Sequence, residues 1–508
     1  MRWSLATWML LLTLLAGSDA LAGEQAINPR TMPAIGTVDE RFQSYNVEMV
    51  EVAGGRFWKP FAPERAETAA AAQSSSEHEM YAYRPPTDLA NARVRKLAAA
   101  LAPAYVRVSG TWANATYFAD ADAPPPAPPA GFDSVLTRAQ WRGVVDFARA
   151  VDARLVTSFA VSPGSRDTAG VWQPDQARRL LAYTNSLGGR IAAVEYMNEP
   201  TLAAQNGAPA GYDAAAYGRD FRIFRRFLKK ASPDTLLLGP GSVGESTSRA
   251  ASGLNSADLL AASGRGIDRF SYHHYGTVSP RCGGRDRPDD ALSEEWLSRT
   301  DKTLAFYRAL RDQFEPGKPL WLTETADAAC GGNRWDATFL DTFRYLDQLG
   351  RMARAGVQVV MHNTLAASDY GLLDEKSFEP RPNYWGALLW RRLMGRTVLD
   401  AGVSPEPGLH VYAHCLRGTR GGVSVLALNT SPDAPHTLSL PTASERYTLE
   451  ATHLQDKSVR LNGDTLRLGV NDQLPAFTAV PAPAGAVTLA PASIMFLTVP
   501  TAGNRACR

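Results

Sequence analysis

Cysteine and net charge are both scarce in this sequence, and each scarcity excludes a class of protein. Only four of the 508 residues are cysteine, and no CxxC or HExxH motif occurs, so we expect no zinc site. Lysine and arginine number 53 against 51 aspartate and glutamate residues, for a formal net charge of +2. That near balance argues against a nucleic-acid partner and against binding to a membrane surface.

Long apolar runs are also lacking beyond the N-terminus. The run from Ser4 to Ala16 follows Arg2 and precedes the small-residue motif Ala20-Leu21-Ala22, which predicts a signal peptide over residues 1–22 that is cleaved before Gly23. A retained N-terminal anchor is the alternative. We therefore expect a secreted or periplasmic protein that has no membrane contact after cleavage.

Eight short apolar segments alternate with segments of helical periodicity, which is typical of strands buried on both faces. The expected strands span 42–52, 105–110, 154–161, 191–197, 235–239, 269–273, 319–323 and 357–362. Expected helices include 88–101, 137–151, 213–230, 293–313 and 335–355. The alternation predicts an α/β fold, a (β/α)8 TIM barrel over residues 41–400. A doubly wound sheet is disfavoured because no Gly-rich phosphate loop follows an early strand.

The pattern changes near Asp400. Short alternating runs separated by Pro, Gly, Asn and Asp fill residues 401–508, which predicts a C-terminal β-sandwich domain. The segment 23–40 is a candidate extra strand of that sandwich. Two low-complexity stretches, 62–79 and 120–131, are expected to be loops on the C-terminal face of the barrel.

Four cysteines in an exported chain allow two disulfides in three connectivities. We favour Cys282–Cys330 and Cys415–Cys507 because each pair falls within one predicted domain.

Two glutamates follow apolar strands at the positions where barrel enzymes carry their catalytic groups. Glu199 follows the fourth strand in Asn198-Glu199-Pro200, and Glu324 follows the seventh. A pair of carboxyl groups in different protonation states is what glycoside hydrolysis requires. Asn198 is suited to hydrogen-bond the sugar 2-hydroxyl. Structural roles, a helix cap for Glu199 and an arginine partner for Glu324, are the alternative.

With these residues in view, the chain resembles glycoside hydrolase family 79, the family of heparanase and microbial β-glucuronidases. The strongest blocks are 41–52, 105–118, 194–200, 271–276, 320–332 and 369–399. The resemblance implies a retaining mechanism with Glu199 as acid/base and Glu324 as nucleophile. It implies a glucuronoside substrate and neither a metal nor another cofactor.

The resemblance also implies a binding site for the sugar carboxylate. The turn at Gly331 and Gly332 would offer backbone N–H groups, and Tyr370 would join them. Backbone N–H groups can hold an anion without a buried counter-charge, and glycine permits the close approach. An ordinary turn and a packing tyrosine are the alternatives.

Four further residues match family positions around the sugar. Glu48 is implied to reach the sugar hydroxyls, Thr111 to lie near the same subsite, and His274 and Tyr275 to lie beside the nucleophile. The run His273-His274-Tyr275 at a strand end could orient Glu324 and tune its charge. The alternative is that these three are packing residues.

These observations predict a retaining β-glucuronidase that cleaves an oligo- or polysaccharide containing glucuronic acid, such as a heparan-type glycosaminoglycan or a plant glucuronide, by double displacement. A β-glycosidase for a neutral sugar on the same barrel is one alternative. A carbohydrate-binding protein with a decayed site is another, disfavoured because both carboxylates and Asn198 are present. No obligate protein partner is predicted.

Overall fold

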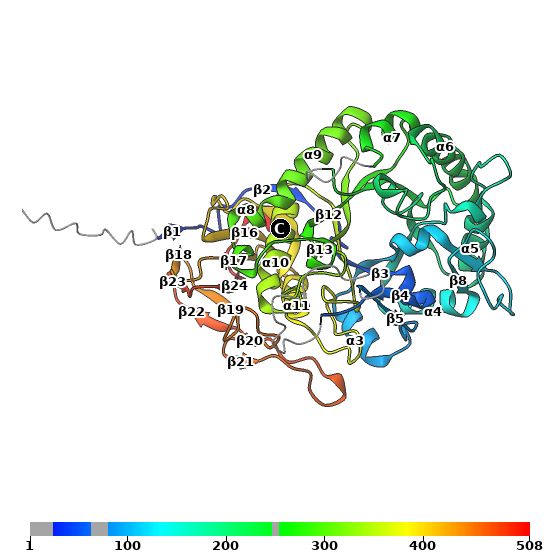
Figure 1. Cartoon of the computed structure of the whole chain (residues 1–508). Helices are drawn as coiled ribbons and strands as arrows, with labels where there is room; N and C mark the ends of the chain where they lie inside the picture. The colour runs from blue at the N-terminus through cyan, green and yellow to red at the C-terminus, as the bar shows by residue number, and fades with distance from the viewer. Residues whose placement is uncertain (1–23, 62–79, 246–252) are drawn as a thin grey trace, which may run out of the picture.

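The computed structural model describes residues 24–61, 80–245 and 253–508 (Figure 1). The predicted signal peptide and the 62–79 stretch lie outside the described residues. Within those three ranges, no helix combines the length and the apolar character needed to cross a membrane.

Eight parallel strands close into a barrel in the order β3-β6-β9-β10-β11-β12-β13-β14, which confirms the predicted TIM barrel. The barrel strands are β3 (Gln43–Glu48), β6 (Ala104–Ser109), β9 (Ala153–Thr157), β10 (Ile191–Glu195), β11 (Leu236–Ser242), β12 (Arg269–Val278), β13 (Leu320–Ala329) and β14 (Val359–His362). Alternate side chains fill the interior, where Trp321 packs with Tyr105 and other apolar residues in one layer.

Helices follow most of the barrel strands, as the periodicity predicts. They are α1 (Met49–Ala53), α3 (Ala92–Ala100), α4 (Arg138–Ala150), α5 (Asp175–Ser186), α6 (Ala214–Ala231), α7 (Ser256–Ser263), α8 (Glu294–Leu297), α9 (Arg299–Phe314), α10 (Phe339–Arg354) and α11 (Pro382–Leu393). Local sequence explains their ends: Thr137 and Gln140 form a capping box at the start of α4. The single helix expected over 293–313 is divided into α8 and α9 at Ser298.

Short 3-10 helices occur in the connections. They are η1 (Thr111–Ala115), η2 (Pro163–Ser165), η3 (Pro200–Leu202), η5 (Pro280–Cys282), η6 (Pro288–Asp290), η7 (Val470–Asp472) and η8 (Arg505–Cys507).

Small sheets flank the two low-complexity stretches, and the sequence did not predict them. β4 (Gly55–Trp58) pairs antiparallel with β5 (Tyr81–Arg84), on either side of 62–79. β7 (Thr116–Ala119) pairs with β8 (Ser134–Thr137), on either side of 120–131.

A second layered unit, coloured blue at its N-terminal strands and yellow to red elsewhere, lies beside the barrel (Figure 1). Its larger sheet contains β2 (Ala34–Thr37), β15 (Met394–Leu399), β16 (Leu409–Leu416), β17 (Val423–Asn429), β24 (Ser493–Val499), β19 (Ser444–Glu450), β20 (Arg460–Leu461), β21 (Asp464–Thr465) and β22 (Val480–Ala482). Its smaller sheet contains β1 (Gln25–Ala26), β18 (His436–Leu440) and β23 (Gly485–Leu489). The apolar cluster between them is the core of a β-sandwich.

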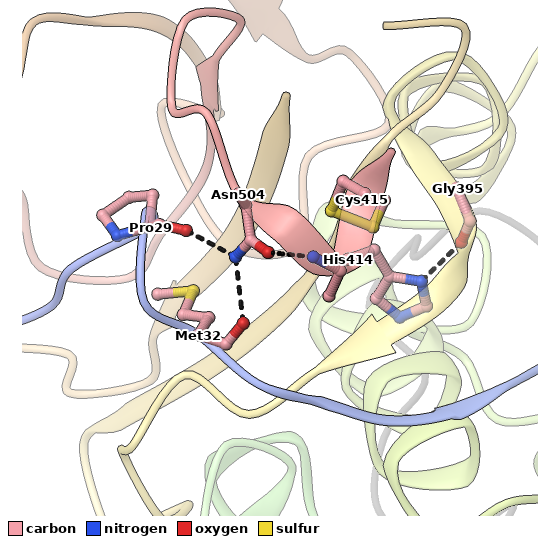
Figure 2. Close-up of a disulfide and its surroundings, with 8 residues drawn as sticks. Pro29, Met32, Gly395, His414, Cys415 and Asn504 are labelled. Atoms are coloured by element: carbon pink, nitrogen blue, oxygen red, sulfur yellow. Dashed lines mark hydrogen bonds between the residues drawn. A yellow bond between two sulfur atoms is a disulfide. The ribbon is translucent and has the colours of Figure 1, made fainter. Parts of the chain in front are cut away.

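Both ends of the described chain meet in this sandwich (Figure 2). The Asn504 side chain donates to the carbonyl oxygens of Pro29 at 2.7 Å and Met32 at 2.9 Å. The nearby Cys415–Cys507 disulfide joins β16 to the C-terminal tail. The Cys282–Cys330 disulfide is also present, so both favoured pairings are confirmed.

Helix α10 lies between the barrel and the larger sheet. A Cβ atom on Gly350 would meet the Tyr412 ring at 2.4 Å, so glycine lets the helix approach strand β16 closely. Asp347, one turn earlier, accepts hydrogen bonds from Tyr412 at 2.5 Å and lies 2.6 Å from His410 Nδ1. Buried polar contacts therefore connect the two units.

Candidate active site

The structure brings Glu199 and Glu324 together at the carboxyl end of the barrel. The His273 ring of β12 lies beside both: its Nδ1 is 3.1 Å from Glu199 Oε1 and 3.7 Å from Glu324 Oε2. One oxygen of each carboxylate and a ring nitrogen of His273 all lie within 4.8 Å of one another.

A bulge in β13 directs Glu324 into the barrel. The pairing of β12 with β13 shifts between Tyr272, opposite Leu322, and His273, opposite Glu324, which leaves Thr323 as the extra residue. Thr323 and Glu324 consequently both contact interior groups, Glu195 and Arg107 respectively. Bulges of this kind are common beside active sites because they redirect a side chain.

A tightly held turn positions Glu199. Its backbone is left-handed, with φ 45° and ψ 65°, an uncommon conformation for a residue other than glycine. The side chain of Asn114 donates to the carbonyl of Asn198 at 2.9 Å and accepts from its N–H at 2.8 Å. Surrounding structure thus holds a strained turn, as is frequent at functional sites.

Arg107 of β6 connects the buried polar groups below the two glutamates. Its guanidinium donates to Glu324 Oε2 at 2.8 Å, to Glu195 Oε2 at 2.8 Å and to Asn198 Oδ1 at 2.7 Å. Arg107 and Glu195 are each 1% exposed. Arg107 therefore supplies positive charge to one side of the glutamate pair, and it fixes the orientation of Asn198.

The surroundings push the pKa values of the two glutamates apart. Burial raises the pKa of Glu199 above its usual value, and the charge of Glu324 adds to this, although the hydrogen bond with His273 opposes it. Burial would also raise the pKa of Glu324, but His273, Arg107 and the hydroxyl of Tyr275 outweigh it and lower that pKa. The pair can therefore hold one proton on Glu199 while Glu324 is ionised.

Tyr275 and Glu48 lie on the other side of Glu324. The Tyr275 hydroxyl donates to Glu324 Oε1 at 2.6 Å, and Asn363 donates to both Tyr275 at 3.0 Å and Glu48 Oε1 at 3.1 Å. The other oxygen of Glu48 is buried without a hydrogen-bond partner and would lie 1.5 Å from a Cβ on Gly110. Glu48 therefore lies against the turn that precedes Thr111.

His274 does not join this group, and its expected place beside the nucleophile is wrong. Its Nδ1 lies 2.9 Å from Thr303 Oγ1 on α9, outside the barrel. Side chains along β12 alternate, so the inward positions fall to His273 and Tyr275, and His274 faces the helix layer. Burial lowers the pKa of His274 to about 3, which suits a neutral packing residue.

The Gly331–Gly332 turn lies between β13 and α10, close to Tyr370. Both glycines have positive φ, 84° and 91°, and a Cβ on Gly332 would meet the Tyr370 nitrogen at 3.3 Å. Neither N–H donates a hydrogen bond to a described residue. Arg281 donates to the neighbouring Cys330 carbonyl at 3.1 Å. The turn thus presents N–H groups beside a guanidinium.

Sequence reasoning missed Arg107, Glu195 and Asn363, and it left His273 open between orienting Glu324 and packing. The sequence did hold a signal for Arg107 and Glu195: a charged residue at an inward position of a buried strand is costly unless it is paired. Arg107 lies two residues after the inward-facing Tyr105. No comparable signal marks Asn363.

The atoms of Glu199, His273 and Glu324 are also close enough to hold a metal ion. Arg107 Nη1, 2.8 Å from Glu324 Oε2, opposes a second cation at that oxygen. The arrangement therefore suits acid–base and nucleophilic chemistry by the carboxyl groups themselves.

Comparison with known proteins identifies the family. The sequence profile of the glycosyl hydrolase family 79 N-terminal domain matches residues 131–350. Heparanase from Bos taurus is 32% identical over 394 residues, which cover 74% of this chain and 70% of that protein. The chain belongs to glycoside hydrolase family 79. Hyaluronoglucuronidase from Hirudo nipponia is 27% identical over 469 residues, or 83% of this chain and 92% of that protein.

Solved structures agree on the fold. A 4-O-α-L-rhamnosyl-β-D-glucuronidase from Fusarium oxysporum aligns with a TM-score of 0.65 over 93% of this chain and 100% of that chain, at 14% identity. Membership of family 79 confirms the resemblance drawn from the motif blocks and makes the protein a glycoside hydrolase.

Proposed function

We propose that this family 79 enzyme is a retaining β-glucuronidase in which Glu324 is the nucleophile and Glu199 the general acid/base. The observation that carries the proposal is the electrostatic asymmetry of two carboxyl groups whose nearest oxygens are less than 4.8 Å apart. Inverting enzymes separate their carboxyl groups by about 6.5–9.5 Å to admit a water, whereas retaining pairs are about 5–5.5 Å apart.

The reaction proceeds in two displacements. The ionised carboxylate of Glu324 attacks the anomeric carbon while Glu199 transfers its proton to the departing glycosidic oxygen, which gives a covalent glycosyl-enzyme. Glu199, now ionised, takes a proton from water as that water attacks the same carbon and releases Glu324. Asn198, held by Arg107 at 2.7 Å, is placed to hydrogen-bond the sugar 2-hydroxyl.

The Gly331–Gly332 turn supports a uronic acid as the sugar. Its two N–H groups, together with Tyr370, suit a carboxylate. Arg281 lies beside the turn, where its guanidinium is paired with Asp369 at 2.8 Å. Glu48 and Thr111 would face the sugar hydroxyls, and Tyr275 would orient the nucleophile. The heparanase and hyaluronoglucuronidase relatives support a polymer containing glucuronic acid as the natural substrate.

Secretion after cleavage at residue 22 is part of the proposal. Two disulfides, Cys282–Cys330 and Cys415–Cys507, support it, because disulfides persist in oxidising compartments.

Nitrophenol release from nitrophenyl β-glucuronide, compared with the matching β-glucoside and β-xyloside, tests the function. We expect turnover selective for the glucuronide, reduced at least about a thousandfold in Glu324→Gln, which cannot form the glycosyl-enzyme. Preference for a neutral sugar would overturn the carboxylate site and leave the two-step mechanism standing. A mechanism-based label that still attaches to Glu324→Gln would place the nucleophile elsewhere.

A further inference from the structure

A second group of buried carboxylates lies directly beneath the Gly331–Gly332 turn. Asp327 lies near the end of β13, Asp336 is in the following loop, and Asp341 is in the first turn of α10. A Cβ on Gly332 would meet Asp336 Oδ2 at 2.4 Å. The three side chains each offer an oxygen within 4.8 Å of the others.

Much of this group lacks hydrogen-bond partners. Both carboxylate oxygens of Asp336, one of Asp327 and the side-chain oxygen of Asn333 are buried and accept no hydrogen bond. Asp336 is 2% exposed and Asp327 1%. Burying a charged or polar group without a partner is costly, and three such carboxylate oxygens in one group indicate a missing positive ligand.

The charges in the group do not balance. Arg344 is bound to Asp341 through Nε at 2.6 Å and Nη2 at 2.8 Å. Three carboxylates against this one guanidinium leave a formal charge of minus two when all are ionised. A buried excess of two negative charges is neutralised by one divalent cation.

We propose that Asp327, Asp336 and Asp341 bind a Ca²⁺ ion that braces the Gly331–Gly332 turn. Every donor in the group is an oxygen, which is the ligand that hard cations take, and Ca²⁺–oxygen distances are about 2.3–2.6 Å. Oxygens no more than 4.8 Å apart can reach one ion at roughly that range. Asn333 supports the group from the loop, because its side-chain nitrogen donates to Asp327 Oδ2 at 2.6 Å.

The ion would link β13 to the start of α10 across the loop that carries the turn. Its effect on substrate binding rests on the proposed function, since it assumes that the turn holds the sugar carboxylate. Binding of the ion itself does not, and it is measured without substrate.

The test uses the full chain, treated with a chelator and dialysed. Calorimetric titration with CaCl2 and thermal unfolding at millimolar CaCl2 are compared for the wild type, Asp336→Asn and the control Asp312→Asn, whose carboxylate is on the surface of α9. We expect binding heat and a rise in Tm of at least about 3 °C in the wild type and the control, both absent from Asp336→Asn.

Two results would overturn the site. A wild type with neither heat nor a Tm shift would mean that the carboxylates share protons instead of a cation. A Tm shift retained in Asp336→Asn would place the ion at another site.

The choice of cation is tested with MgCl2 in place of CaCl2. This should give a smaller Tm shift, because Mg²⁺ requires tighter octahedral geometry; an equal or larger shift would contradict the assignment to Ca²⁺. Asp327→Asn repeats the comparison if Asp336→Asn does not fold.

Discussion

The barrel mouth and the joint between barrel and sandwich are both buried ionic networks, yet they match their charges differently. At the mouth, Arg107 faces Glu195 and Glu324 at 2.8 Å each, and Glu199 lies nearby. Acidic groups outnumber the arginine there. At the joint, Asp347 of α10 is paired with Arg351 at 2.6 Å and also contacts His410 and Tyr412 of the sandwich. Glu294 pairs with both Arg351 and His410, and Asp301 pairs with Arg351, so two basic groups face three acidic ones.

The pKa values record this difference. At the joint, burial alone would raise the pKa of Asp347, but its pairing with His410 and Arg351 lowers it. Burial alone would lower the pKa of His410, but Asp347 raises it to about 9. At the mouth the pKa of Glu324 falls while that of Glu199 rises. A nearly matched set of charges holds elements together, whereas the larger acidic excess at the mouth keeps a proton available for transfer.

Glu199→Gln should produce the largest effect by removing that proton. Glycosides with poor leaving groups need protonation, so we expect their kcat/KM to fall by about 10²–10⁴-fold, with a smaller loss for nitrophenyl glycosides. The alkaline limb of the wild-type pH profile should also disappear, because it reports loss of the proton from Glu199.

Leaving-group dependence is therefore the measurement, with aryl glucuronides of graded acidity as substrates. A uniform loss across the series would assign Glu199 a role in binding and not in proton transfer.

Arg107→Met tests how the one arginine at the barrel mouth affects stability and the pKa of Glu324. Without the guanidinium, Glu195 and Glu324 lose their shared partner, so we expect a loss of about 3–5 kcal/mol in the free energy of unfolding. The pKa of Glu324 should also rise, which moves the acid limb of the pH–activity profile to higher pH. The matched control is Arg166→Met, which breaks another buried pair, with Asp220 at 2.7 Å.

Both variants should be destabilised, but only Arg107→Met should move the acid limb. Equal profiles would mean that Arg107 acts through stability alone. Arg107→Lys, which keeps the charge, should retain most of the fold and part of the activity and leave the acid limb near its wild-type position.

The barrel could be predicted from the sequence because its strands are short apolar runs at regular intervals. All eight predicted strands are present. Glu199 and Glu324 could be picked out from the sequence because each follows such an apolar run. The networks around them could not be predicted, since Arg107 lies in β6 and Asn363 directly follows β14, and each reaches its glutamate only when the barrel closes.

Side-chain direction was the other limit. His273 and His274 are adjacent in sequence, and only the register of β12 decides which faces the glutamates. The bulge that turns both Thr323 and Glu324 inward breaks the simple alternation of β13. A sequence pattern with a period of two does not reveal where such a bulge falls.

The smallest expected effect is the pH dependence of the free energy of unfolding that His410 contributes at the joint. Its pKa is about 9 in the folded protein against about 6.5 in an unfolded chain. A raised pKa adds stability that is complete below pH ~6.5 and is lost as pH rises towards 9, by up to about 3 kcal/mol. The stability advantage of the wild type over His410→Asn should shrink by that order between pH 6.5 and 9.5, measured by urea unfolding.

His414→Asn is the control of opposite sign. Burial lowers the pKa of His414 to about 4, so this residue is neutral in both states above pH ~6.5 and its contribution changes only on the acid side. Its difference from the wild type should stay constant from pH 6.5 to 9.5. If the His410→Asn difference were equally constant, His410 would not be charged at the joint. His410 would then be a neutral hydrogen-bond donor to Asp347, and Arg351 would be the cation that Asp347, Glu294 and Asp301 share at the joint.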